Sequence, residues 1–170
     1  MDVLNAIHTR RSVRRFADTE VTERQVERLL RAAMAAPSAM NEQPWRFVVI
    51  RDAEMREKLS GISPYAGPIA RASVAIAVLA HPTSTQAPNR WTMDCAAATQ
   101  NILLAAHASG LGTCWIGVFP EDEREAAVVE LLGVASDMRV LCLVAVGVPE
   151  GAGADVDRYN PEFVHTERWS

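Results

Sequence analysis

The stretch Ala-Ser-Val-Ala-Ile-Ala-Val-Leu-Ala at residues 72–80 is an almost unbroken apolar run. A strand with one face in water alternates apolar and polar side chains, so this run predicts a strand that is covered on both faces. Aromatic and β-branched residues favour strands elsewhere as well. The four expected strands are residues 45–50, 72–80, 113–118 and 140–148.

Helical patterns alternate with these strands and have recognisable ends. Thr22 and Gln25 form a capping box, because each side chain can bond the main-chain amide of the other. Pro37 disfavours a helical residue before it, and Gly110 and Gly133 are natural helix ends. Since helices and strands interleave, helices should cover both faces of one sheet. The expected helices are residues 2–9, 22–36, 54–59, 91–109 and 122–132.

The first residues predict a short helix and no signal peptide. Asp2 can cap this helix, in which Leu4 and Ile7 are expected to face inward. Residues 1–5 lack the basic start and following apolar run of a secretory signal. We therefore expect a cytoplasmic protein.

The C-terminal residues differ in composition from the rest of the chain. Residues 151–154, Gly-Ala-Gly-Ala, predict a hinge, and residues 155–170 turn polar and aromatic. Exposed aromatic side chains on a lone tail are unfavourable, so we expect the tail to pack on a partner subunit. Residues 1–150 are thus expected to form one domain, with residues 151–170 as its C-terminal arm.

The bulk composition is that of one globular domain. The chain has 170 residues, of which 49% are hydrophobic and 22% charged. Its net charge of −4 argues against a general nucleic-acid binder. The most apolar helix, residues 94–109, contains Gln100, Asn101 and His107, which suits a buried helix better than a membrane span.

No side chain stands out as a nucleophile, a metal ligand or a proton relay. The cysteines are far apart among apolar neighbours, so we expect inert core thiols at Cys95, Cys114 and Cys142. The histidines have no metal-ligand spacing, and we interpret His107 as a hydrogen-bonded core histidine. This pattern favours a protein in which a cofactor supplies the chemistry, with no bound metal.

Four arginines crowd into Arg-Arg-Ser-Val-Arg-Arg-Phe at residues 10–16. One interpretation is a solvated helix end, where cations favour the helix dipole. The other is an anion site, because the planar guanidinium suits phosphate oxygens and Ser12 adds a hydroxyl donor. In an acidic protein such a local cluster suits a phosphorylated small molecule.

A polar loop bracketed by prolines, Pro-Ser-Ala-Met-Asn-Glu-Gln-Pro-Trp at residues 37–45, enters the first expected strand. It is either an ordinary connection or a rigid loop that recognises a heterocycle. Asn41 and Gln43 carry both donors and acceptors, which the edge of such a ring requires.

The stretch Gly-Leu-Gly-Thr-Cys-Trp-Ile-Gly at residues 110–117 is not a dinucleotide fingerprint. Trp115 occupies the third glycine position, and the motif follows a helix and opens a strand. It predicts either a plain helix end and core strand, or a strand whose backbone approaches a flat ligand, with Gly117 leaving room. In the tail, Arg158 is either a second phosphate ligand or a solvated arginine.

In this order, the motifs at residues 10–14, 37–47, 110–117 and 157–169 resemble the nitroreductase family of FMN enzymes over nearly the whole chain. The resemblance implies an α+β fold, a three-layer α-β-α sandwich with a central mixed, mainly antiparallel sheet. It also implies a homodimer with FMN at the subunit interface and the C-terminal tail extended onto the partner.

The resemblance assigns cofactor contacts by position. Arg10, Ser12 and nearby Arg11 would hold the phosphate and ribityl chain, and Arg14 would lie at the N1–C2=O edge of the flavin ring. Arg158 would be a second phosphate contact. Further contacts would come from the partner's loop and from the strand beside the ring: Pro37, Ser38, Ala39, Asn41 and Gln43 in the loop, and Trp115, Ile116 and Gly117 in the strand.

The implied activity is reduction of nitroaromatics, quinones or similar small acceptors by ping-pong hydride transfer, with NADH or NADPH as the donor. No catalytic side chain is assigned. With only residues 82–89 between a strand and the long helix, the chain resembles a compact family member. Two alternatives stay open: other flavin chemistry, such as dehalogenation, ene reduction or flavin fragmentation, and FMN binding without turnover.

Overall fold

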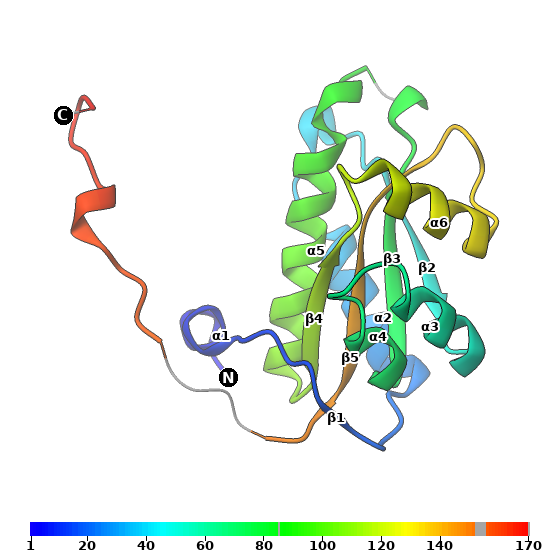
Figure 1. The fold of residues 1–170 in the computed structure, drawn as a ribbon. Helices are drawn as coiled ribbons and strands as arrows, with labels where there is room; N and C mark the ends of the chain where they lie inside the picture. The colour runs from blue at the N-terminus through cyan, green and yellow to red at the C-terminus, as the bar shows by residue number, and fades with distance from the viewer. Residues whose placement is uncertain (85, 152–155, 170) are drawn as a thin grey trace.

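A computed structural model describes residues 1–84, 86–151 and 156–169, and one five-stranded sheet lies at its centre (Figure 1). The longest strand, β5, pairs with β3, with β4 and, near its C-terminal end, with β1, and β3 also pairs with β2. All these strand pairs are antiparallel, and the described chain adds one parallel bridge, Ser12 to Thr113. The strands are β1 (Phe16–Ala17), β2 (Trp45–Ile50), β3 (Val74–Ala80), β4 (Gly112–Gly117) and β5 (Arg139–Pro149).

Helices cover both faces of the sheet, which confirms the three-layer architecture. Alternate residues of β3 enter opposite cores, because successive strand side chains point to opposite faces. Ile76 packs with α2 and α5, whereas Leu79 packs with α3, α4 and α6. The helices are α1 (Val3–Thr9), α2 (Glu23–Met34), α3 (Ala53–Ser60), α4 (Pro68–Arg71), α5 (Trp91–Ala108) and α6 (Asp122–Leu132).

The expected elements are present with small shifts at their ends. Every residue of β3 is buried, as the apolar run predicts. Thr22 and Gln25 form the expected capping box, although α2 ends at Met34, before the predicted residue 36. Gly110 and Gly133 end their helices with φ of 76° and 62°, a conformation that glycine adopts without steric cost. The short β1 and α4 were not expected.

The orientation predicted for the first helix is wrong. Asp2 caps α1 as expected, but Ala6 is the buried residue of this helix. Leu4 and Ile7 are 69% and 48% exposed, because α1 contacts α5 along its Ala6 side. These two side chains leave an apolar surface at the N-terminus of the single chain.

The C-terminal tail runs away from the sheet and its helices (Figure 1). Its large apolar side chains, Tyr159, Phe163 and Trp169, are all exposed. The predicted hinge at residues 151–154 lies outside the described residues except for Gly151. In the ranges that the structure describes, no helix combines the length and the apolar character required to cross a bilayer.

The prediction for the cysteines is confirmed. All three are buried free thiols. Burial raises the pKa of Cys95 and of Cys142 to about 12, and burial also raises the pKa of Cys114. Because the thiolate is the reactive form, these groups are inert near neutral pH.

Candidate functional site

The arginine segment lies along the sheet at the start of β4. The Val13 N–H donates to the Thr113 carbonyl oxygen at 2.8 Å, beside the bridge from Ser12 to Thr113. The Val13 side chain lies against Gly112, where an added Cβ would be 2.8 Å from it. Such a distance is shorter than real Cβ contacts allow, so glycine is required here.

A second glycine, Gly147, leaves room for the end of the same segment. Gly147 lies opposite Gly112 in the β4–β5 pair, and a Cβ on it would lie 2.8 Å from the Phe16 ring. Phe16 itself pairs with Pro149 as part of β1. The two glycines therefore let the arginine segment lie directly on the β4–β5 backbone.

The start of the segment is tied to the C-terminal end of α5. Thr9 Oγ1 lies 2.7 Å from His107 Nε2, and the Arg10 N–H donates to the Ala6 carbonyl oxygen. His107 is thus a hydrogen-bonded histidine of α5, as the sequence indicates. This contact fixes where Arg10 and Arg11 leave α1.

Arg10, Arg11 and Arg158 line one cavity of about 270 Å³, together with His8, Asp157 and Tyr159. Arg11 Nη2 donates to the Val156 carbonyl oxygen at 3.3 Å, which joins the tail to the arginine segment. Burial, and then the charges of Arg11 and Arg158, lower the pKa of Arg10. The mutual repulsion of these guanidinium groups makes the cavity favourable for an anion.

Arg14 lies on the β4 side of the segment. With Arg11, Ser12 and Glu150 it lines a second cavity of about 370 Å³. The charge of Arg14 lowers the pKa of the Cys114 thiol in β4, against the larger opposite effect of burial. Arg14 is therefore near the strand that carries the other predicted ring contacts.

Within β4 the three predicted residues differ in what they offer to a ligand. Gly117 is exposed and Trp115 is half-buried. The Ile116 side chain is buried in the core that faces α3, α4 and α6. Only the main chain of Ile116 is then available to a flavin ring.

The loop at residues 37–43 is held rigidly near the start of α5. Asp94, a buried carboxylate, accepts the Ala39 N–H at 2.9 Å. Ser38 Oγ accepts the Gln43 N–H at 3.0 Å, and Asn41 Oδ1 accepts from Gln43 Nε2 at 3.4 Å. These bonds favour the rigid-loop interpretation over an ordinary connection.

Backbone strain marks the same loop. Met40, Asn41 and Gln43 have φ of 53°, 57° and 52°, although side chains disfavour this region by about 1 kcal/mol or more each. Glu42 adds a further anchor, since its carboxylate accepts the main-chain N–H of Gln86 at 2.6 Å. Strain of this kind persists where the surrounding contacts over-determine it, as they do here.

The predicted contacts therefore fall into two groups at opposite ends of α5. The loop is tied to Asp94 and the arginine segment to His107, 13 residues further along this helix. A helix rises about 1.5 Å per residue, so these anchors are about 20 Å apart along the axis. None of the described cavities lined by Arg10, Arg11 or Arg14 includes a residue of the loop.

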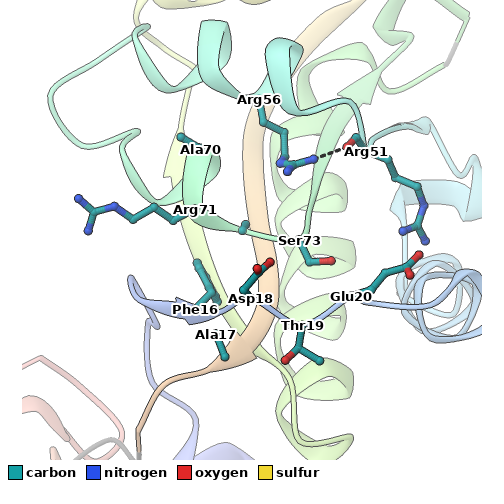
Figure 2. A pocket seen from close by; sticks show the side chains of 11 residues that line it. Phe16, Ala17, Asp18, Thr19, Glu20, Arg51, Arg56, Ala70, Arg71 and Ser73 are labelled. Atoms are coloured by element: carbon teal, nitrogen blue, oxygen red, sulfur yellow. Dashed lines mark hydrogen bonds between the residues drawn. The ribbon is translucent and has the colours of Figure 1, made fainter.

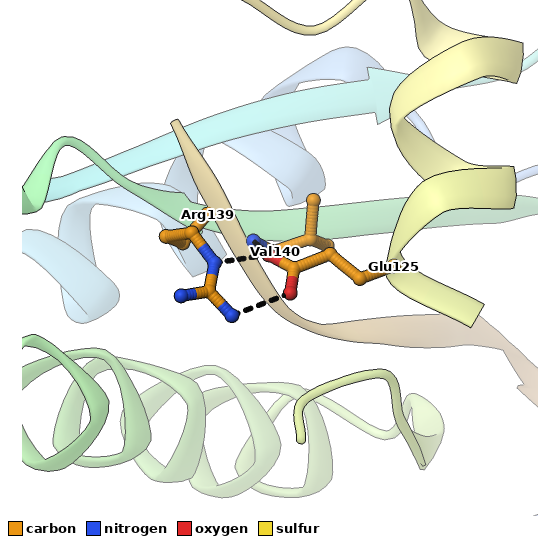
Figure 3. A network of polar contacts seen from close by, with 3 residues as sticks. All are labelled: Glu125, Arg139 and Val140. Carbon is orange, nitrogen blue, oxygen red and sulfur yellow. Dashed lines mark hydrogen bonds and ion pairs between the residues drawn. The ribbon is translucent and has the colours of Figure 1, made fainter. Parts of the chain in front are cut away.

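An ion pair between the buried Glu125 and the half-buried Arg139 joins α6 to the start of β5 (Figure 3). Glu125 of α6 accepts two hydrogen bonds from Arg139, at 2.8 and 2.7 Å, and one from the Val140 N–H. The Arg139 guanidinium also lies 5.6 Å from the Trp91 ring centre and 5.3 Å from that of Phe119. Arg139 thus links α6 to Trp91 at the start of α5 and to Phe119, two residues after β4.

Another cavity, of about 410 Å³, lies beside β1 and contains none of the predicted residues (Figure 2). Its lining includes Arg51 and Arg56 as well as Asp18 and Glu20. Arg71 also lines it, so cationic and anionic side chains meet there with a smaller net positive charge than in the arginine site, where three arginines face Asp157.

Two features of these anchors were not predicted from the sequence: the role of Asp94 and the partner of His107. Asp94 is the one acidic residue of α5, in the first turn of a mostly apolar helix, and that contrast was the available signal. The polar side chain of His107 near the other helix end was noticed, but its partner Thr9 is 98 residues away. Pairing across such a separation needs the fold.

Known proteins are similar to this chain in both sequence and fold. Residues 7–63 and 64–148 match the nitroreductase family. A protein of Archaeoglobus fulgidus assigned as an NADH dehydrogenase/NAD(P)H nitroreductase is 44% identical over 173 aligned residues, covering 99% of each chain.

Two solved structures extend the similarity. A protein assigned as an NADH oxidase from Clostridium acetobutylicum has a TM-score of 0.93 and 38% identity, covering 99% of this chain and 100% of that one. A protein from Desulfovibrio desulfuricans assigned as a nitroreductase was solved in complex with FMN. It has a TM-score of 0.85 and 32% identity, covering 100% of this chain and 99% of that one.

Proposed function

Since this chain belongs to the nitroreductase family, we propose that it is an FMN-dependent oxidoreductase that takes electrons from NADH or NADPH. The relative from Archaeoglobus fulgidus is named for NADH and NAD(P)H, and the structure from Desulfovibrio desulfuricans contains FMN. Both match this chain over almost its whole length.

The observation that carries the proposal is the cavity shared by Arg10, Arg11 and Arg158. Three guanidinium groups from two distant segments converge there, and their repulsion is relieved by an anion. A terminal phosphate carries about −1.5 to −2 charge at neutral pH and three acceptor oxygens, which fits this donor set. Arg10 and Arg158 would hold the FMN phosphate, with Arg11 and Ser12 beside it.

The flavin ring would then extend from the phosphate toward β4. Bound FMN would accept a hydride from the nicotinamide and pass electrons on to a second substrate. Arg14 would stabilise negative charge on the ring electrostatically, without transferring a proton. Gly117 and the main chain of Ile116 would let the ring approach the strand, with Trp115 beside it.

We further propose that the protein is a homodimer in which each FMN is bound by both subunits. The rigid loop and the arginine segment are anchored about 20 Å apart along α5, so the loop of one chain would complete the site of the other. Pro37, Ser38, Ala39, Asn41 and Gln43 would supply these contacts.

The exposed apolar side chains at both ends of the chain support this assembly. Leu4 and Ile7 of α1, together with Phe163 and Trp169 of the tail, would be covered by the partner. The division into a domain at residues 1–150 and an arm at residues 151–170 stays a prediction.

Turnover is tested by following NADH and NADPH oxidation with a quinone or a nitroaromatic as the acceptor. We expect steady oxidation that depends on FMN. A bound flavin that neither donor reduces would instead indicate FMN binding without turnover. If NADH or NADPH is oxidised only in the presence of a halogenated or an ene substrate, FMN and the electron donor would be as proposed, and only the acceptor would differ.

A cytoplasmic location stays a prediction from residues 1–5.

A further inference from the structure

The hydrogen bonds of Thr9 determine which nitrogen of His107 carries a proton. Thr9 Oγ1 lies 2.6 Å from the Asn5 carbonyl oxygen and 2.7 Å from His107 Nε2. A carbonyl oxygen only accepts, so the single hydroxyl proton of Thr9 goes to Asn5. His107 must then donate an Nε2–H to Thr9, which assigns the ring its Nε2-protonated form.

The acceptor of this bond lies next to the arginine site in the chain. Thr9 is the last residue of α1 and directly precedes Arg10. His107 and Arg11 line one cavity of about 380 Å³ together with Val13 and Gly112. The bond therefore joins the end of α5 to the point from which the arginines project.

The helix α1 has few other means of holding its orientation. It has seven residues, and helices this short are marginal without tertiary contacts. Ala6 is its one buried residue among those the structure describes, while Leu4 and Ile7 are exposed. The hydrogen bond at its last residue, Thr9, therefore contributes strongly to the position of the residues that follow.

We propose that His107 is a positioning residue for the FMN phosphate site, which orients Arg10 and Arg11 by donating a hydrogen bond to Thr9. The inference rests on the proposed function, because it takes the phosphate of FMN as the ligand of these arginines. It assigns His107 no contact with the cofactor and no proton transfer.

The charges near His107 agree with a neutral donor. Burial, and then the charges of Arg10 and Arg11, lower the pKa of His107. A ring without positive charge does not repel the arginines, yet the Nε2–H remains available for Thr9. The cavity beside His107 is lined by Met1, which carries the N-terminal amine, and by Arg11, and its other described lining residues have no charged side chain.

The test compares variants that remove the bond with variants that retain it. His107→Leu removes the donor and Thr9→Val the acceptor, whereas His107→Gln and Thr9→Ser retain a comparable polar group. The FMN dissociation constant is measured by flavin fluorescence, and circular dichroism checks the fold. We expect His107→Leu and Thr9→Val each to raise this constant about fivefold to tenfold.

The pattern across variants separates positioning from general stability. His107→Gln and Thr9→Ser should bind FMN within about threefold of wild type, and the double variant His107→Leu/Thr9→Val should be no weaker than either single variant. The kcat at saturating FMN should not change. If His107→Leu and Thr9→Val bind FMN as tightly as wild type, or if His107→Gln and Thr9→Ser bind it as weakly as those two variants, the role of His107 is overturned and the proposed function is not. A wild-type protein that takes up no FMN would overturn the proposed function as well.

Discussion

Val13 and Gly112 are in such close contact that a methyl group on Gly112 would lie 2.8 Å from the Val13 Cβ and both of its methyl groups. The Val13 N–H also donates to Thr113, the next residue of β4. The position of the arginine segment is therefore set by one strand of the sheet, and the placement of Arg10, Ser12 and Arg14 depends on a glycine.

Replacing this glycine should separate the segment from the strand. Gly112→Ala should destabilise the fold by about 1–3 kcal/mol, as over-packed substitutions do. It should also weaken FMN binding, because Arg10 and Ser12 move with Val13. Gly67→Ala is the matched control, since an added Cβ there meets no atom within 4 Å. Chemical denaturation and FMN titration of both variants check the prediction, and equal FMN affinities would contradict it.

Arg10→Ala should weaken FMN binding and leave the fold intact. Losing a charge-assisted bond to phosphate costs about 1.5–3 kcal/mol, or about tenfold to hundredfold in dissociation constant. The control is Arg15→Ala, whose side chain is 81% exposed and lies 4.0 Å from Glu150. An exposed pair of this kind contributes little, so Arg15→Ala should bind FMN normally. Unchanged affinity in Arg10→Ala would show that the cluster is not the phosphate site.

Mixing two defective chains should restore FMN binding if each site is shared between subunits. Arg10→Ala impairs the arginine group and Asn41→Ala the loop group, so each homodimer has two defective sites. A hybrid dimer combines the intact arginines of one chain with the intact loop of the other, which regenerates one site. Co-refolded mixtures should thus bind more FMN than either variant alone. No gain in mixtures that contain hybrid dimers would indicate sites within single chains.

The stability contributed by Glu125 should disappear in acid. Burial alone would raise its pKa, but bonds from Arg139 and the Val140 N–H outweigh burial and lower it. Because the pKa of Glu125 is lower in the folded state than the unfolded pKa near 4.5, ionised Glu125 stabilises the protein at pH values above 4.5. This stabilisation is lost as the pH falls through the pKa of the folded state.

Glu125→Gln should accordingly be less stable than wild type by about 1–3 kcal/mol at neutral pH. The difference should shrink as the pH is lowered below about 4.5. Glu130→Gln, an exposed change on the same helix, should show no such difference. Urea denaturation at several pH values measures these free energies, and a difference that persists in acid would contradict this role for Glu125.

The sheet and its covering helices could be predicted from sequence because burial leaves a periodic local pattern. The run at residues 72–80 indicated β3, and Gly110 and Gly133 indicated two helix ends. The direction that α1 faces could not be predicted, since Leu4 and Ile7 have the helical spacing of core residues but lie at a surface that a single chain leaves open.

For the site, sequence identified the residue types but not what holds them. Arg10 and Arg158 are 148 positions apart, and only the fold brings them to one cavity. The supports of the two groups, Asp94 for Ala39 and His107 for Thr9, are likewise distant contacts. Local patterns contain no information about such pairs.

The most direct test of the central claim is the visible absorption spectrum of the purified protein, incubated with FMN and freed of unbound flavin, before and after addition of NADH or NADPH without air. We expect the protein to retain oxidised flavin that at least one donor bleaches. Reoxidation on adding a quinone or a nitroaromatic would complete the cycle. A protein that retains no FMN, or whose bound flavin neither donor reduces, would contradict the claim.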